Sequence, residues 1–125
     1  MTEHEALEQI AVVDYCEALH IPVYHVPNED RRSPARGKKL KRMGMRAGVP
    51  DLVIPLARGG WFGLYIEMKY GKNKTTPAQD DWLELLSRNH YKCHVCYGAD
   101  AAIKAINAYI KLRPTYDYVL SSPVK

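Results

Sequence analysis

Apolar residues recur at helical spacing in three stretches of the chain. In the first stretch Thr2 is followed three residues later by Glu5, which is the spacing of a capping box. In the second, Thr76 precedes Pro77, and proline is favoured in the first turn of a helix. The spacing predicts helices over residues 2–19, 75–90 and 99–112.

Shorter runs rich in β-branched and aromatic residues lie between these helices, as expected of strands. The run 21–27 is bounded by prolines, which favours a place near the edge of a sheet. The runs 51–57 and 61–70 are separated by "RGG", a hairpin signal, and a further run covers 91–98. Elements in this order indicate an α/β fold, a mixed β-sheet flanked by helices on both faces.

A long polar connection covers residues 28–48 and contains "SPARGKKLKRMG", which predicts a short helix capped by Ser33. Connections of this length in a compact domain are usually functional or mobile. Eight of the 18 Lys and Arg residues fall between Arg31 and Arg46, where no acid occurs, although the net charge is only +4. This basic cluster is either a surface for phosphate groups or an ordinary solvated face.

The length of 125 residues indicates about one domain, which we place at residues 1–112, and residues 113–125 form a tail without an assignment. No apolar run approaches the roughly 20 residues of a membrane span, and the start "MTEHEALEQ" is too acidic for a signal peptide. We therefore expect a cytoplasmic protein without membrane partners. Strand alternation places Cys93 and Cys96 of "CHVC" on opposite faces, so structural thiols are expected rather than a zinc or redox pair.

Three charged residues stand at unusual places in the two hairpin strands: Asp51, Glu67 and Lys69. Side chains alternate along a strand, so Glu67 and Lys69 share a face, and the hairpin can bring Asp51 opposite Glu67. Two such carboxylates repel unless a proton or a cation lies between them, and Mg²⁺ is a natural occupant. The pattern predicts metal-assisted phosphodiester hydrolysis with Lys69 beside the attacked phosphate. The alternative is a cross-strand salt bridge between Lys69 and one acid.

Longer segments follow one another in a characteristic order: "HVPNEDRR", "GMRAGVPDL", "GLYIEMK", "TPAQDDWLELL" and "HVCYGADAAIKAINAY". From about Glu3 to Ile110 the chain resembles the VRR-Nuc (virus-type replication-repair nuclease) family of the PD-(D/E)xK nuclease superfamily, in its short stand-alone form typical of phages. The resemblance implies a restriction-endonuclease-like fold. It also implies a DNA endonuclease that depends on Mg²⁺ or Mn²⁺ and leaves a 5′-phosphate.

The resemblance assigns roles to residues at the matching positions. Asp51 and Glu67 would be metal ligands together with the carbonyl of Met68, and Lys69 would be the catalytic lysine. Gln79 matches a glutamine near the catalytic site, although it can also be an ordinary exposed helix residue.

The family also places a glutamate of the first helix at the metal site. Glu5 is the favoured candidate, because it precedes Gln9 in an E-x-x-x-Q arrangement, and Glu3 and Glu8 are the alternatives.

DNA is the partner that the basic connection and the resemblance imply together. Asn28 matches a position at the edge of the site, although an asparagine there can simply form a turn. The expected DNA-binding residues are Asn28, Arg31, Arg32, Arg36, Lys38, Lys39, Lys41, Arg42 and Arg46.

Stand-alone members of the family resemble structure-selective enzymes that act as homodimers on branched DNA, including four-way (Holliday) junctions. Candidate dimer surfaces here are the segment around Trp61 and the tail from Arg113. The alternatives are a flap or single-strand nuclease in a replication or repair complex, and a non-catalytic DNA-binding module of the same fold. His25 and His90 have no partner spacing, so ordinary structural roles are expected for them.

Overall fold

A computed structural model describes residues 1–27 and 33–121 of the chain. The helices are α1 (Glu3–Ala18), α2 (Pro34–Arg42), α3 (Pro77–Arg88), α4 (Ala99–Ile110) and α5 (Thr115–Ser121). The strands are β1 (Tyr24–His25), β2 (Leu52–Ile54), β3 (Leu64–Lys69) and β4 (Lys92–Tyr97). Among the described residues, no helix combines the length and the apolar character needed to cross a membrane.

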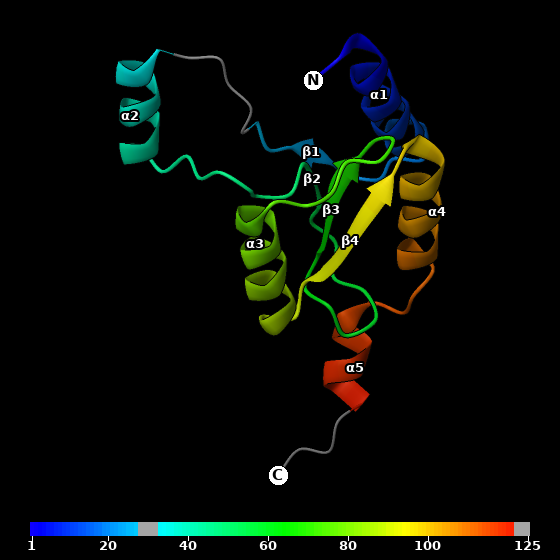
Figure 1. Cartoon of the computed structure of the whole chain (residues 1–125). Helices are drawn as coiled ribbons and strands as arrows, with labels where there is room; N and C mark the ends of the chain where they lie inside the picture. The colour runs from blue at the N-terminus through cyan, green and yellow to red at the C-terminus, as the bar shows by residue number, and fades with distance from the viewer. Residues whose placement is uncertain (28–32, 122–125) are drawn as a thin grey trace.

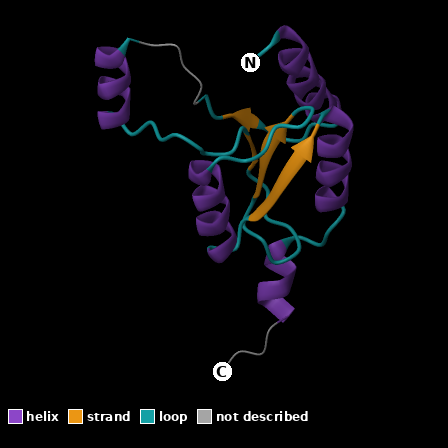
Figure 2. Ribbon diagram, in the orientation of Figure 1, coloured by secondary structure: helices purple, strands orange, loops and turns teal. Residues whose placement is uncertain are grey.

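The strands form one mixed sheet in the order β1-β2-β3-β4. The first two pairs are antiparallel, which confirms the predicted hairpin between β2 and β3. β3 and β4 run parallel, and α3 makes the crossover between them. Helices α1 and α4 lie on one side of the sheet and α3 on the other, as Figures 1 and 2 show. The predicted mixed sheet with helices on both faces is therefore confirmed.

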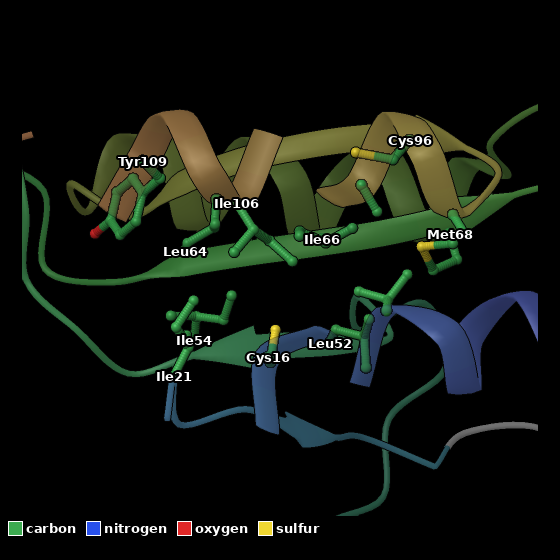
Figure 3. Packing of buried hydrophobic residues seen from close by; sticks show 13 residues of the cluster. Cys16, Ile21, Leu52, Ile54, Leu64, Ile66, Met68, Cys96, Ile106 and Tyr109 are labelled. Carbon is green, nitrogen blue, oxygen red and sulfur yellow. The ribbon is translucent and has the colours of Figure 1, made fainter. Parts of the chain in front are cut away.

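The main core lies between the sheet and the pair α1 and α4 (Figure 3). Val12 of α1, Ile66 of β3 and Ile106 of α4 are fully buried there. Leu64, Ile66 and Met68 belong to this core, so alternation turns the intervening side chains of β3 toward α3. This alternation places Glu67 and Lys69 on the α3 side of the sheet.

The predicted helix starts are confirmed by their caps. Thr2 and Glu5 form a capping box at α1, and Thr76 forms one with Gln79 at α3. The hydroxyl of Ser33 accepts from the backbone N–H of Arg36 at α2. Local chemistry was sufficient here because each cap involves residues three positions apart.

Two segments differ from the sequence-based expectation. The strand expected over residues 21–27 is shortened to Tyr24–His25, and it pairs with β2 alone at the edge of the sheet. The tail from Arg113 contains helix α5 and is joined to the loop between β2 and β3, where the N–H of Gly59 donates to the carbonyl of Arg113 at 2.6 Å. The N–H of Thr115 also donates to the carbonyl of Ala57. Each of these hydrogen bonds joins residues more than 50 positions apart in the sequence, so no local sequence pattern predicts it.

Cys93 and Cys96 point to opposite faces of β4, as predicted. The Cys93 thiol faces the carbonyl of Leu83 in α3, whereas Cys96 is buried in the main core. Burial raises the pKa of both thiols, and that of Cys96 reaches about 11. Both thiols are therefore protonated at neutral pH, which suits packing rather than nucleophilic chemistry.

Candidate active site

Asp51 and Glu67 are brought together by the register of the hairpin. Asp51 directly precedes β2, and Leu52 pairs with Ile66, so the next positions place Asp51 across from Glu67. The Oδ2 atom of Asp51 accepts a hydrogen bond of 2.7 Å from the backbone N–H of Met68. The carbonyl of Asp51 accepts from the N–H of Val26 at 2.8 Å. Asp51 is thus fixed at its side chain and at its backbone.

The loop before Asp51 also positions helix α3. Gly48 has a φ of +89°, and a Cβ there would lie 2.6 Å from the carbonyl carbon of Ala78. Only glycine allows the loop to lie this close to the N-terminus of α3. The contact brings the first turn of α3, which carries Gln79, next to the acid pair.

Glu67 is more buried than Asp51 and Lys69, with only 3% of its surface exposed. Its Oε2 atom accepts a hydrogen bond of 3.2 Å from Nε2 of Gln79 and lies 3.7 Å from Nζ of Lys69. The other end of the Gln79 amide, Oε1, accepts from the N–H of Thr76 at 2.9 Å. Gln79 therefore caps α3 and holds Glu67 with the same side chain.

Burial and mutual repulsion disfavour the charged form of both acids. The pKa of Glu67 rises to about 8, first because of burial and then because of the charge of Asp51, while Lys69 opposes the shift. Burial also raises the pKa of Asp51, against the hydrogen bond from Met68 and the charges of His25 and Lys69. Without a cation the pair therefore retains a proton near neutral pH, and a bound divalent cation would take the place of that proton.

The three glutamates of α1 occupy different environments. Glu3 is exposed. Glu8 accepts a hydrogen bond of 3.0 Å from the N–H of Ala99 and so caps α4, whose N-cap residue Gly98 has no side chain to do so. Glu5 borders the same cavity as the acid pair. Of these three glutamates, Glu5 is the one that borders the cavity, whereas Glu3 and Glu8 do not.

The acid pair opens into a small polar cavity of about 240 Å³ at the end of the sheet where α1, β2, β3 and α3 meet. The residues that border it are Met1, Glu5, Asp51, Glu67, Met68, Lys69, Tyr70, Asn73 and Gln79. Within residues 1–27 and 33–121, no three His, Cys, Asp or Glu side chains cluster as a complete set of metal ligands. Two carboxylates beside a polar cavity nevertheless fit a hard divalent cation that keeps several waters, because Mg²⁺ is usually bound in this way.

Sequence and structure comparisons agree with this fold. The profile of the VRR-NUC domain matches residues 4–100, which is most of the chain. The chain belongs to the VRR-NUC family.

Solved structures of VRR-NUC proteins share the fold. One, described as a VRR_NUC domain protein, has a TM-score of 0.78 and 33% sequence identity, and the match covers 91% of this chain and 93% of that chain. Another, described as a VRR_NUC domain, has a TM-score of 0.57 and 24% identity, covering 84% of this chain and 96% of that chain, and it supports the fold alone. No curated protein matches the sequence. Membership of the family implies a nuclease-type, DNA-processing function.

The described basic residues expected to bind DNA do not border the cavity of this VRR-NUC domain but lie on and after α2. Figure 1 shows α2 set apart from the sheet and from the helices that pack on it. Arg36, Lys38, Lys39, Lys41, Arg42 and Arg46 are all exposed. Arg46 also donates from Nη1 to the carbonyls of Lys41 and Met45, at 2.8 and 3.0 Å, so it closes the C-terminal end of α2. Asn28, Arg31 and Arg32 lie outside the described residues.

Sequence reasoning missed three residues at this VRR-NUC site. Tyr70 and Asn73 follow β3 and border the cavity. Nδ1 of His25 lies 2.9 Å from the carbonyl of Asp51 and 3.2 Å from Nε2 of Gln9, so it links α1 to the backbone of the acid pair. Tyr70 directly follows Lys69 in the sequence, but alternation turns its side chain to the other face of the strand.

Proposed function

We propose that this VRR-NUC protein is a metal-dependent endodeoxyribonuclease of the PD-(D/E)xK type. The observation that carries the proposal is the pairing of Asp51 with Glu67 beside a polar cavity, with Nζ of Lys69 3.7 Å from the Glu67 carboxylate. A buried acid pair with raised pKa values, next to an ammonium group in a cavity, is typical of a functional site rather than of a structural salt bridge.

Asp51, Glu67 and the carbonyl of Met68 would hold the cation, which is Mg²⁺ or Mn²⁺ in this proposal. When bound, such an ion lowers the pKa of a coordinated water and polarises a phosphoryl oxygen. Gln79 keeps Glu67 oriented through its hydrogen bond of 3.2 Å. Lys69 projects from the same face as Glu67, where its positive charge offsets the negative charge that develops on the attacked phosphate. Glu5 adds a third carboxylate at the border of the cavity.

The exposed basic helix α2 is the proposed binding surface for the DNA backbone. Its cations lie on one short helix without an acidic residue. Contacts with phosphate position a protein on DNA but do not read base sequence, so selection by DNA structure is expected. We propose branched DNA, including four-way junctions, as the substrate class.

Paired cleavage of a branched substrate requires two sites, and a symmetric dimer would supply them. The segment around Trp61 and the tail from Arg113 lie together in the structure. Arg58 forms isolated antiparallel β-bridges with Trp61 and with Pro114. Phe62 and Tyr116 on these segments are 55% and 68% exposed, and the neighbouring Leu112 is 41% exposed. We propose that this apolar surface forms the dimer contact.

Cleavage of labelled four-way, flap, duplex and single-stranded DNA with Mn²⁺ tests the proposal. Asp51→Asn and Lys69→Ala should each slow cleavage of the preferred substrate by at least about 100-fold, since loss of one group that stabilises transition-state charge has this effect. Both variants should fold and bind DNA as the unaltered protein does. Lys104→Ala, which removes an exposed lysine of α4, is the matched control and should cut at the normal rate. Light scattering of the same preparation reports the oligomeric state.

The same experiment separates the remaining alternatives. Full activity of Lys69→Ala would reject the assigned mechanism. DNA binding without cleavage in any metal would identify a binding module of the same fold. Preference for flaps or single strands over four-way junctions would replace the proposed substrate class but keep the catalytic site.

A further inference from the structure

Tyr70 borders the cavity, and its hydroxyl is buried without an evident structural role. Its ring packs against the main core, and its Oη atom is buried without a hydrogen-bond partner among the described residues. Two other tyrosines have partners: Oη of Tyr109 donates to the carbonyl of Leu56, and Oη of Tyr97 donates to that of Asn73, both at 2.7 Å. A buried hydroxyl is normally paired, so an unpaired one on a residue that borders a polar cavity suggests a partner that enters from the cavity.

The acceptors around Tyr70 indicate that its hydroxyl acts as a donor. A phenol keeps its proton at neutral pH, because its ordinary pKa is about 10. Carboxylates accept but do not donate when ionised, so Tyr70 adds a neutral donor to a cavity border that is otherwise rich in acceptors.

We propose that the Tyr70 hydroxyl donates a hydrogen bond to a water molecule in the cavity, and that this water belongs to the hydration shell of the divalent cation held by Asp51 and Glu67. The inference rests on the proposed function. A cavity of about 240 Å³ has room for water. Mg²⁺ loses its waters reluctantly and keeps several in protein sites, so a donor-acceptor environment for those waters is part of a good site.

Glu5 completes the environment of this water. It comes from α1 and borders the cavity together with Tyr70, which follows β3. With Tyr70 as one hydrogen-bond partner and Glu5 as another, the water is held between two elements that are distant in sequence. Tyr70 is thus a positioning residue that acts through water on the cation and on Glu5.

Tyr70→Phe tests the inference by metal binding rather than by activity. The substitution keeps the ring that packs on the core and removes only the unpaired hydroxyl. The metal-free variant should therefore melt at the same temperature as the unaltered protein or higher. Its Kd for Mn²⁺, measured by titration calorimetry, should rise by about 10-fold, as is usual when an outer-shell partner of a metal site is lost. The rise in melting temperature with added Mn²⁺ should shrink accordingly.

Tyr109→Phe is the matched control, because it removes a buried hydroxyl that has a protein partner far from the cavity. It should lower the melting temperature of the metal-free protein and leave the Kd for Mn²⁺ unchanged. An unchanged Kd in Tyr70→Phe would overturn the inference, and so would a fall in metal-free melting temperature like that of Tyr109→Phe. Asp51→Asn distinguishes the two proposals: if it binds Mn²⁺ as well as the unaltered protein does, the proposed metal site itself fails and the role of Tyr70 fails with it.

Discussion

The acid-lined cavity and the basic helix α2 carry opposite charges and are held in place in opposite ways. Around the cavity, contacts join elements distant in sequence: Asp51 accepts from Met68, and Gln79 donates to Glu67. Helix α2 is held by its own Ser33 cap and by Arg46 at its C-terminal end. Two acids stay close only if a surrounding core forces them together, whereas attraction to phosphate needs no more than exposed charge. The difference predicts that the same kind of substitution has unequal effects in the two regions.

The largest difference should come from alanine at a glycine in each region. Gly48→Ala adds a Cβ at positive φ that would overlap the backbone of Ala78, so α3 must move. We expect a loss of about 3 kcal/mol in the free energy of unfolding and loss of cleavage, because Gln79 moves away from Glu67. Gly44→Ala also has a positive φ but nothing within 4 Å of the new Cβ. It should cost only about 1 kcal/mol and retain activity at saturating DNA.

Urea denaturation and the cleavage assay measure both variants. Equal losses in Gly44→Ala and Gly48→Ala would show that the approach of the loop to α3 does not hold the cavity together.

A smaller effect, confined to DNA affinity, is expected from α2. Replacement of Lys38, Lys39 and Lys41 by glutamine should reduce the slope of log affinity against log salt by about 3, since each phosphate contact contributes close to one unit. The rate of cleavage at saturating DNA should stay the same because the cavity is untouched. Lys104→Gln on α4 is the control with an exposed lysine elsewhere. A slope that does not change after the triple replacement would place the DNA path away from α2.

A further effect should be a pH dependence of stability that arises at the cavity. The pKa of Glu67 is raised from 4.5 to about 8 in the folded chain, so between these values the folded state binds more protons than the unfolded state. Stability of the metal-free protein should therefore fall as pH rises through this range, and Asp51 shifts in the same direction.

Thermal melts in chelator from pH 5 to pH 9 measure this slope, which Glu67→Gln should reduce. Glu84→Gln removes an exposed acid of α3 and should leave the slope as it is. Added Mn²⁺ should also flatten the slope if the cation replaces the shared proton. A metal-free protein whose melting temperature rises over this range would contradict the raised pKa of Glu67.

Sequence patterns were most reliable where structure depends on near neighbours. The caps of α1, α2 and α3, the hairpin signal "RGG" and the alternation along β3 all involve residues a few positions apart. The expected strand around Tyr24 was too long, and α5 was missed, because both depend on contacts with distant segments.

The residues of the candidate site also fall into two groups, those placed by local spacing and those placed by tertiary packing. Asp51, Glu67 and Lys69 were identified from spacing alone, since a hairpin and a period of two suffice to place them near one another. Which glutamate of α1 borders the cavity depends on how α1 packs against α4, where Glu8 caps the helix and leaves Glu5 at the cavity. Tyr70 belongs to this second group, because its ring packs on the core side of the sheet and only the folded chain shows that it also borders the cavity.

The amino-acid sequence by itself determined helices α1 to α4 and strands β2 to β4 of this VRR-NUC chain, the acids and lysine of the hairpin and the basic charge of α2. Only the tertiary structure decided which helices meet at the end of the sheet, and therefore the surroundings of Glu67, the position of Glu5 and the burial of the Tyr70 hydroxyl. The physical reason is the separation in sequence over which each interaction acts. Turns, caps and strand alternation are determined by neighbouring residues, whereas burial and electrostatic repulsion act between groups that only the folded chain brings together.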